Sequence, residues 1–114
     1  DGNVYYKDAE IFNDEDHSVH LSNYDPKIRL EDKGEEVFLH FSFDTSIVEL
    51  ENKLISTAIL GRAKTPDMKF ENADGSPFTI DRDYFDKQRN SQNPFPGPFE
   101  SPGSGTMVIK VWPK

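Results

Sequence analysis

The fold is decided by the stretch Lys27-Ile28-Arg29-Leu30-Glu31-Asp32-Lys33-Gly34-Glu35-Glu36-Val37-Phe38-Leu39-His40-Phe41-Ser42-Phe43-Asp44. On a strand, Val37, Leu39, Phe41 and Phe43 fall on one face and the residues between them fall on the other. Before the turn, Ile28 and Leu30 alternate with charged residues in the same way. Period-two alternation on both sides of a turn that contains Gly34 predicts a β-hairpin with one buried face.

Outward from this hairpin, the same alternation continues in residues 107–112, which follow a Pro-Gly-Ser-Gly turn and predict a terminal strand. Shorter strands are expected at 3–6, 9–12, 18–21 and 78–80. Residues 47–60 fit either a helical stripe or two strands, 47–50 and 54–60, around a turn. Because Ile55, Thr57 and Ile59 are β-branched, we expect strands, and the helix alternative stays open over 47–54.

Many short strands joined by turns, without a long helix, are typical of an all-β protein. We therefore expect an antiparallel Ig-like or jelly-roll-like β-sandwich of roughly seven strands. Residues 61–105 hold six of the eight prolines and show little periodicity, so they are expected to form a long loop packed on one side of the sandwich. The chain starts without Met in a strand-like segment. We expect residues 1–114 to be a single domain of a longer multidomain protein.

The composition excludes several classes of function. Nine Phe, four Tyr and one Trp favour a folded chain over a disordered one, although 30% of the residues are charged. The formal charge of −8 and the lack of Lys and Arg clusters argue against nucleic acid as a partner. No apolar run is long enough for membrane insertion. There is no cysteine, which excludes disulfides, thiolate metal sites and cysteine nucleophiles.

No motif for catalysis is present. The chain has no Gly-x-Ser-x-Gly elbow, and with 21 acidic residues any pair of carboxylates is expected by chance. Neither the acidic turn at 13–17 nor Asp81, Asp83 and Asp86 match a calcium loop, so we assign no metal and no cofactor, although calcium at the three aspartates stays open. We assign no catalytic residue, and a small hydrolase is the less favoured alternative.

Aromatic binding is the better functional hypothesis, because sugar rings stack on aromatic side chains and their hydroxyls bond to carboxylates, amides and guanidinium groups. Our candidates are Trp112, Tyr84 and Phe95 for stacking, with Asp83 and Arg89 for hydroxyls. The competing interpretation is that the rings cover the edge of the core. For Arg89 we favour a structural role, a salt bridge to Asp81, Asp83 or Glu100 that pins the loop.

Two segments carry a family resemblance. Asp83-Tyr84-Phe85-Asp86-Lys87-Gln88-Arg89, followed by Pro96-Gly97-Pro98-Phe99-Glu100, resembles the closing signature Asp-x-x-Gly-x-x-Arg, spacer, Gly-Ala-x-Glu of secreted bacterial right-handed parallel β-helix proteins that act on polysaccharides. Asp86 stands where glycine is usual, and Pro98-Phe99 replaces alanine and its neighbour. Residues 53–112 also resemble a β-sandwich accessory module associated with such β-helix glycoside hydrolases, through residues 60–64, 74–77 and 96–100.

The resemblance implies a non-catalytic accessory module that either braces a catalytic domain or contacts a polysaccharide or oligosaccharide. It implies an extracytoplasmic location, whether periplasmic, cell-surface or secreted, and leaves open that the parent protein is a glycoside hydrolase. No β-helix coils are visible in this sequence, and no catalytic residue is carried over. The alternatives are a ligand-free structural or interaction domain and, less favoured, a small glycoside hydrolase.

Overall fold

The computed structural model describes residues 2–114, and their contacts divide into two compact units. Unit 1 comprises residues 1–51 and 101–114, and unit 2 comprises residues 52–100. Each unit is described by itself. The expectation of a single domain within a longer protein stays a prediction. None of the helices formed by residues 2–114 is long and apolar enough to cross a membrane.

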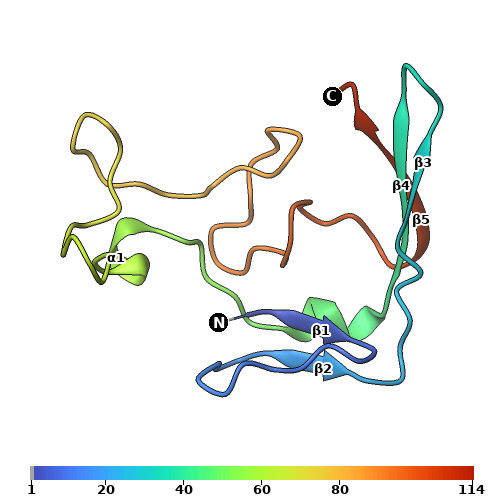
Figure 1. Cartoon of the computed structure of the whole chain (residues 1–114), viewed down its shortest axis with the longest axis horizontal. Coiled ribbons are helices and arrows are strands. Elements are labelled where there is room, and N and C mark those ends of the chain that lie inside the picture. The colour runs from blue at the N-terminus through green and yellow to red at the C-terminus, as the bar shows by residue number, and fades with distance from the viewer. Residues whose placement is uncertain (1) are drawn as a thin grey trace. The chain divides into compact units, whose positions relative to one another are not determined.

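Unit 1 contains the predicted hairpin as β3 (Arg29–Asp32) and β4 (Val37–Phe43), which pair with β5 (Gly105–Trp112) in an antiparallel sheet of order β3-β4-β5 (Figure 1). Leu39 lies opposite both Leu30 and Ile109, as the alternation requires. The turn has the predicted glycine geometry, because Gly34 has a φ of 87° and its N–H donates to Asp32 Oδ1 at 2.8 Å. The hairpin and the terminal strand are therefore confirmed.

A second, two-stranded sheet joins β1 (Val4–Tyr6) to β2 (Val19–Leu21) (Figure 1). The strands predicted at 3–6 and 18–21 are thus confirmed, but they pair in parallel, unlike the antiparallel pairing that was expected. The two sheets meet through stacked rings, because Tyr6 of β1 lies 6.2 Å from Phe43 of β4 with planes 12° apart. Burial of the phenol raises the pKa of Tyr6 to about 12.

The core of unit 1 lies at one end of the three-stranded sheet. Phe41, Ile47 and Leu50 are buried there, whereas Leu30 is exposed although it shares a face with Leu39. Burial of each of the Phe41, Ile47 and Leu50 side chains contributes about 1.5–3 kcal/mol to the free energy of unfolding. The apolar face of the hairpin is therefore buried over part of its length, which the alternation alone does not reveal.

Four predicted strands, at 9–12, 47–50, 54–60 and 78–80, are absent from the structure of residues 2–114. Residues 47–49 belong to a 3-10 helix, η1 (Thr45–Glu49), because Asp44 accepts a hydrogen bond from the Ser46 N–H at 2.8 Å and starts a helical turn. Leu50 caps its C-terminal end. Ile47 and Leu50 are three residues apart, so this turn directs both into the core. The helix alternative was right for 47–49, and the strand prediction for 47–50 was wrong.

Residues 54–60 and 9–12 were also wrongly predicted as strands. The first segment contains a single helical turn, α1 (Thr57–Leu60), which ends at Gly61 with a φ of 67°. The β-branched residues of this segment have no neighbouring strand to pair with, apart from one isolated bridge between Ser56 and Thr79. The strand expected at 78–80 is likewise reduced to this bridge. In 9–12, the Phe12 carbonyl instead accepts a turn hydrogen bond from the Glu15 N–H.

The predicted all-β sandwich class is confirmed, with five strands in two sheets and little helix among residues 2–114. Five strands are fewer than the roughly seven expected, because much of the Pro-rich region forms turns. Most of the expected 61–105 loop belongs to unit 2, which is compact although its backbone makes isolated bridges in place of a sheet. An Ig-like or jelly-roll-like strand order stays a prediction.

Candidate functional site

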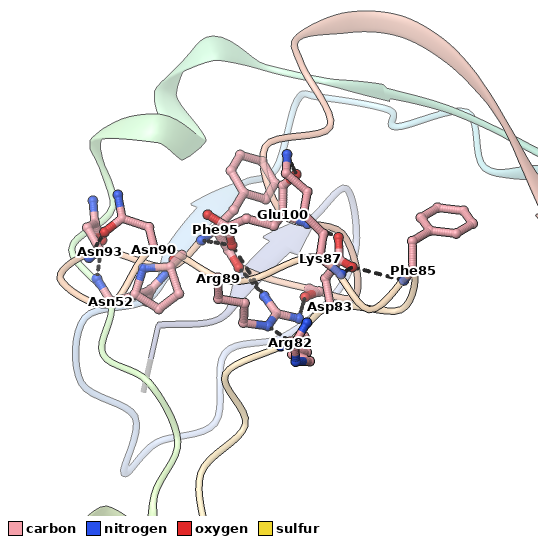
Figure 2. A network of polar contacts seen from close by, with 12 residues as sticks. Asn52, Arg82, Asp83, Phe85, Lys87, Arg89, Asn90, Asn93, Phe95 and Glu100 are labelled. Carbon is pink, nitrogen blue, oxygen red and sulfur yellow. Dashed lines mark hydrogen bonds and ion pairs between the residues drawn. The ribbon is translucent and has the colours of Figure 1, made fainter. Parts of the chain in front are cut away.

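The carboxylate of Asp83 organises the turn that opens the acidic and aromatic segment of unit 2. Its Oδ1 accepts hydrogen bonds from the backbone N–H groups of Phe85 and Lys87, both at 2.9 Å. Its Oδ2 accepts from the N–H of Glu100 at 2.8 Å, so one side chain joins the two ends of the segment (Figure 2). These bonds replace the sheet ladder that this backbone lacks.

The hydrogen bonds to Asp83 also set its protonation. Desolvation acts to raise the pKa of the carboxyl, but the N–H donors of Glu100, Lys87 and Phe85 outweigh it, with a smaller contribution from the Arg89 charge. The net result is a pKa below the ordinary value for aspartate. Asp83 is therefore held as a carboxylate, the form that can accept all three bonds.

Arg89 holds the second half of the segment through its guanidinium group. It donates to the carbonyl oxygens of Arg82 at 3.1 Å, Phe95 at 3.0 Å and Gly97 at 2.9 Å (Figure 2). Its Nη1 also lies 3.6 Å from Glu100 Oε2, and only 11% of the Arg89 side chain and 6% of the Glu100 side chain are exposed. The predicted pinning of the loop by a salt bridge is confirmed, with Glu100 as the partner.

Glu100 completes the arrangement. Its Oε2 accepts from the Phe95 N–H at 3.0 Å, and its carbonyl accepts from Lys87 Nζ at 3.2 Å. Asp83, Arg89 and Glu100 are the three charged positions of the closing signature, and the structure brings them into one network. We call these three residues the clamp. The signature thus has a physical meaning here, since each charged residue satisfies backbone groups of a segment without regular structure.

The position where the signature has glycine also has a structural explanation. Asp86 has a φ of 65°, in the left-handed region that glycine adopts without steric cost. Aspartate tolerates this region better than most residues do. The second glycine position is kept, and Gly97 has a φ of 88°. The substitution of Asp86 for glycine therefore leaves the turn geometry in place.

The aromatic residues of the segment form a cluster beside the clamp. Tyr84 meets Phe85 edge-on at 5.1 Å and Phe99 edge-on at 6.0 Å, and Phe85 stacks on Phe99 at 5.6 Å. Phe99 is buried, whereas Tyr84 and Phe95 are half-buried. Tyr84 and Phe95, two of the predicted stacking residues, are therefore only partly exposed, and the ring contacts of Tyr84 stabilise unit 2.

Trp112 is the remaining predicted site residue and belongs to unit 1, at the end of β5. It pairs with Val37 next to a bulge in the β4–β5 ladder, and 59% of the residue is exposed. The structure thus brings Tyr84, Asp83, Arg89 and Phe95 together in unit 2, whereas Trp112 stands on the sheet of unit 1. An exposed ring of this kind can stack on a flat apolar face of a ligand.

Sequence reasoning missed a shallow groove in unit 1. Its volume is about 390 Å³, at the lower end of the range for small-molecule sites. Val19 and Leu50 supply an apolar part, and Ser18, Ser46, Glu49, Glu51 and His17 supply polar groups. The one signal in the sequence was the acidic turn at 13–17, and nothing in it indicated that η1 would lie beside it.

The described part of the chain contains no group of three His, Cys, Asp or Glu side chains that could hold a metal ion. Asp83 directs its oxygens to backbone N–H groups, and Asp86 makes a long, exposed contact with Arg82 at 3.6 Å. The three aspartates that left calcium open therefore do not converge within residues 2–114.

Comparison with known proteins gives one informative match. No family model matches the chain, and no curated protein matches it. A solved structure, described as the complex structure of XylC with xylose, is similar with a TM-score of 0.89 and 30% sequence identity. The match covers 97% of this chain and 17% of that chain, so the sequence corresponds to a small part of a longer protein of known structure.

Proposed function

We propose that the chain is a non-catalytic accessory module of an extracytoplasmic carbohydrate-active protein, located in the periplasm, at the cell surface or outside the cell. The observation that carries this proposal is the similarity of nearly the whole chain to 17% of XylC, a protein solved with xylose. A module that recurs as part of a larger protein is expected to assist that protein in binding its substrate or in holding its domains. The partners proposed are a polysaccharide or oligosaccharide and the catalytic domain of the parent chain.

Trp112 is the residue that we propose for direct sugar contact. Its ring is the most exposed of the predicted stacking residues, and Tyr84 offers a smaller free surface. Hydroxyl contacts by Asp83 and Arg89 stay a prediction. A carboxylate has about four acceptor sites, so Asp83 keeps one beyond its three backbone donors. Arg89 is mostly buried and donates to three carbonyl groups.

A ligand-free structural module is the second candidate, and a specific observation favours it. The charged residues of the clamp are engaged with one another and with backbone groups, which is what a bracing element requires. In this case the aromatic rings stabilise the module and contact no sugar. The two candidates differ in whether Trp112 contributes to retention on a glycan.

Retention on an immobilised xylan gel and titration with xylo-oligosaccharides separate the candidates. We expect Trp112→Ala to weaken binding about twofold to twelvefold, since an aromatic stacking contact is worth roughly 0.5–1.5 kcal/mol. Phe12→Ala is the matched control, because Phe12 is an equally prominent exposed ring of unit 1, at 66% against 59%. It is expected to leave retention unchanged.

No retention of the wild type would support the ligand-free module. Retention that is unchanged in Trp112→Ala would contradict sugar contact by Trp112. Hydrolysis of aryl xylosides by the purified chain tests the non-catalytic part of the proposal. The expected result is no turnover above the buffer rate, and steady turnover that follows the purified protein would overturn it.

A further inference from the structure

The first half of unit 2 exposes large apolar side chains to an unusual degree. No residue from 57 to 80 is buried. Five large apolar residues in this range have between 38% and 66% of their surface exposed, namely Ile59, Leu60, Met68, Phe70 and Ile80. Single exposed apolar residues are common, but several on adjoining segments indicate a surface that another body covers.

Thr57 brings together the three segments that carry these side chains. Its hydroxyl donates to the Phe70 carbonyl at 2.5 Å and accepts from the Phe78 N–H at 2.7 Å, and its own N–H donates to the Phe78 carbonyl at 2.9 Å. The N–H of Ile80 donates to the Ile55 carbonyl at 2.8 Å. Helix α1, the 68–70 segment and the 78–80 segment are therefore neighbours, so their exposed side chains belong to one region.

The charge of the chain is distributed unevenly between the units. Between residues 52 and 100, seven Lys and Arg residues balance seven Asp and Glu residues, so the formal charge of −8 lies on the remaining residues. Unit 2 is thus electrically neutral overall and exposes apolar side chains. A unit without net charge does not repel an approaching partner over long range, as an acidic unit would repel an acidic one.

We propose that Ile59, Leu60, Met68, Phe70 and Ile80 form a docking surface for another domain of a longer polypeptide. This inference rests on the proposed function in one respect, namely that the chain is part of a larger protein. In XylC the matching region is 17% of the chain, so the rest of that polypeptide is tethered to it. A tethered neighbour is present at high effective concentration, which lets a modest apolar surface stay covered.

The same observations argue against the other occupants. A second copy would bring together two chains that each carry a formal charge of −8, and the repulsion between their acidic residues opposes self-association. A glycan is a poor fit, because the five side chains include neither Trp nor Tyr and offer no hydroxyl or amide. An apolar protein surface is the partner that matches.

Methionine oxidation tests the proposal, because the chain has two methionines, one in each unit. Met68 of unit 2 is 66% exposed, whereas Met107 on β5 is half-buried. The rate at which hydrogen peroxide converts each to the sulfoxide would be measured by mass spectrometry. One sample is the 114-residue chain, and the other is the full polypeptide encoded by its gene.

We expect Met68 to be oxidised at least tenfold more slowly in the full polypeptide, while Met107 changes less than twofold. Ile28→Met provides the matched control, since Ile28 in unit 1 has the same 66% exposure as Met68. Methionine at position 28 is expected to be oxidised equally fast in both samples. Size-exclusion chromatography with light scattering is expected to show a monomer for the 114-residue chain.

Equal oxidation of Met68 in both samples would overturn the docking surface, as would a reading frame with no further domain. Equal protection of methionine at position 28 would also overturn it, because the covered surface would not be specific to unit 2. A dimer of the 114-residue chain that protects Met68 would assign the surface to a second copy. The docking surface and the sugar contact can fail separately, because glycan retention does not involve Met68. If Met68 is protected but the chain is not retained on a glycan, the sugar contact is contradicted and the docking surface stands.

Discussion

The two units of this protein hold their backbones in different ways. Unit 1 uses hydrogen-bonded strands over a small apolar core of Phe41, Ile47 and Leu50, and carries the whole formal charge of −8. Unit 2 is neutral and has isolated bridges, and its second half is held by side chains that bond to backbone groups. A segment without sheet or long helix can therefore be ordered when a few charged side chains satisfy its backbone polar groups.

The largest expected effect comes from removing the clamp arginine. Arg89→Ala leaves Glu100 as a buried carboxylate without its cation and three carbonyl groups without their donor. Breaking a buried pair in this way costs about 3–5 kcal/mol in the free energy of unfolding. Urea unfolding followed by amide NMR signals of unit 2 measures it.

Arg82→Ala is the control for this change. The Arg82 side chain is 52% exposed and pairs with an Asp86 side chain that is 84% exposed. Exposed ion pairs contribute about 0–1 kcal/mol, so we expect Arg82→Ala to lower the free energy of unfolding only slightly. Equal losses for Arg82→Ala and Arg89→Ala would show that unit 2 does not depend on the clamp.

The next effect concerns pH. Because the pKa of Asp83 is lowered in the folded protein, its contribution to stability is present above the unfolded pKa of about 3.9 and is lost as pH falls through the lower folded value. Asp83→Asn removes this titration and weakens bonds worth roughly 1–3 kcal/mol at neutral pH. As pH falls from 5 to the folded pKa of Asp83, the wild type is therefore expected to lose its greater stability relative to Asp83→Asn. Urea unfolding of unit 2 measures this difference in the free energy of unfolding. Parallel curves for the two proteins would contradict the assigned role of Asp83.

The smallest effect restores the glycine of the signature. Asp86→Gly removes the steric cost of a φ of 65° at the expense of an exposed contact with Arg82, so a gain in stability of up to about 1 kcal/mol is expected. Asp81→Gly is the control, because Asp81 is not among the residues with positive φ. It is expected to lose about 0.5–1 kcal/mol, and thermal unfolding measures both. A loss of stability in Asp86→Gly would mean that the aspartate side chain holds the turn.

The sequence carried different amounts of information about the two units. Alternation from Val37 to Phe43 predicted the hairpin, because a strand next to a core must alternate. Ile47 and Leu50 were placed in a strand, since a short apolar segment does not distinguish a 3-10 turn from a strand until the Asp44 cap is known. In unit 2, Asp83 bonds to Glu100 across 17 residues, and no periodicity reports such a contact.

The candidate site could be predicted in its residues but not in its geometry. Arg89 and its carboxylate partner were expected from charge and spacing, and the resemblance placed Asp83, Arg89 and Glu100 in one signature. What the sequence could not show is that their bonds point inward to backbone groups, because this depends on the left-handed turns at Asp86 and Gly97. The groove beside η1 was missed for the same kind of reason, since it depends on a cap at Asp44.

The most direct test of the account is hydrogen exchange of the amides that donate to the clamp, with and without saturating xylo-oligosaccharide. The N–H groups of Phe95 and Glu100 bond to the carboxylates of Glu100 and Asp83. We expect both amides to exchange much more slowly than in an unfolded chain, at rates that sugar leaves unchanged. Exchange at the unfolded rate without sugar, with protection appearing only when sugar is bound, would contradict this expectation by making the clamp a ligand site.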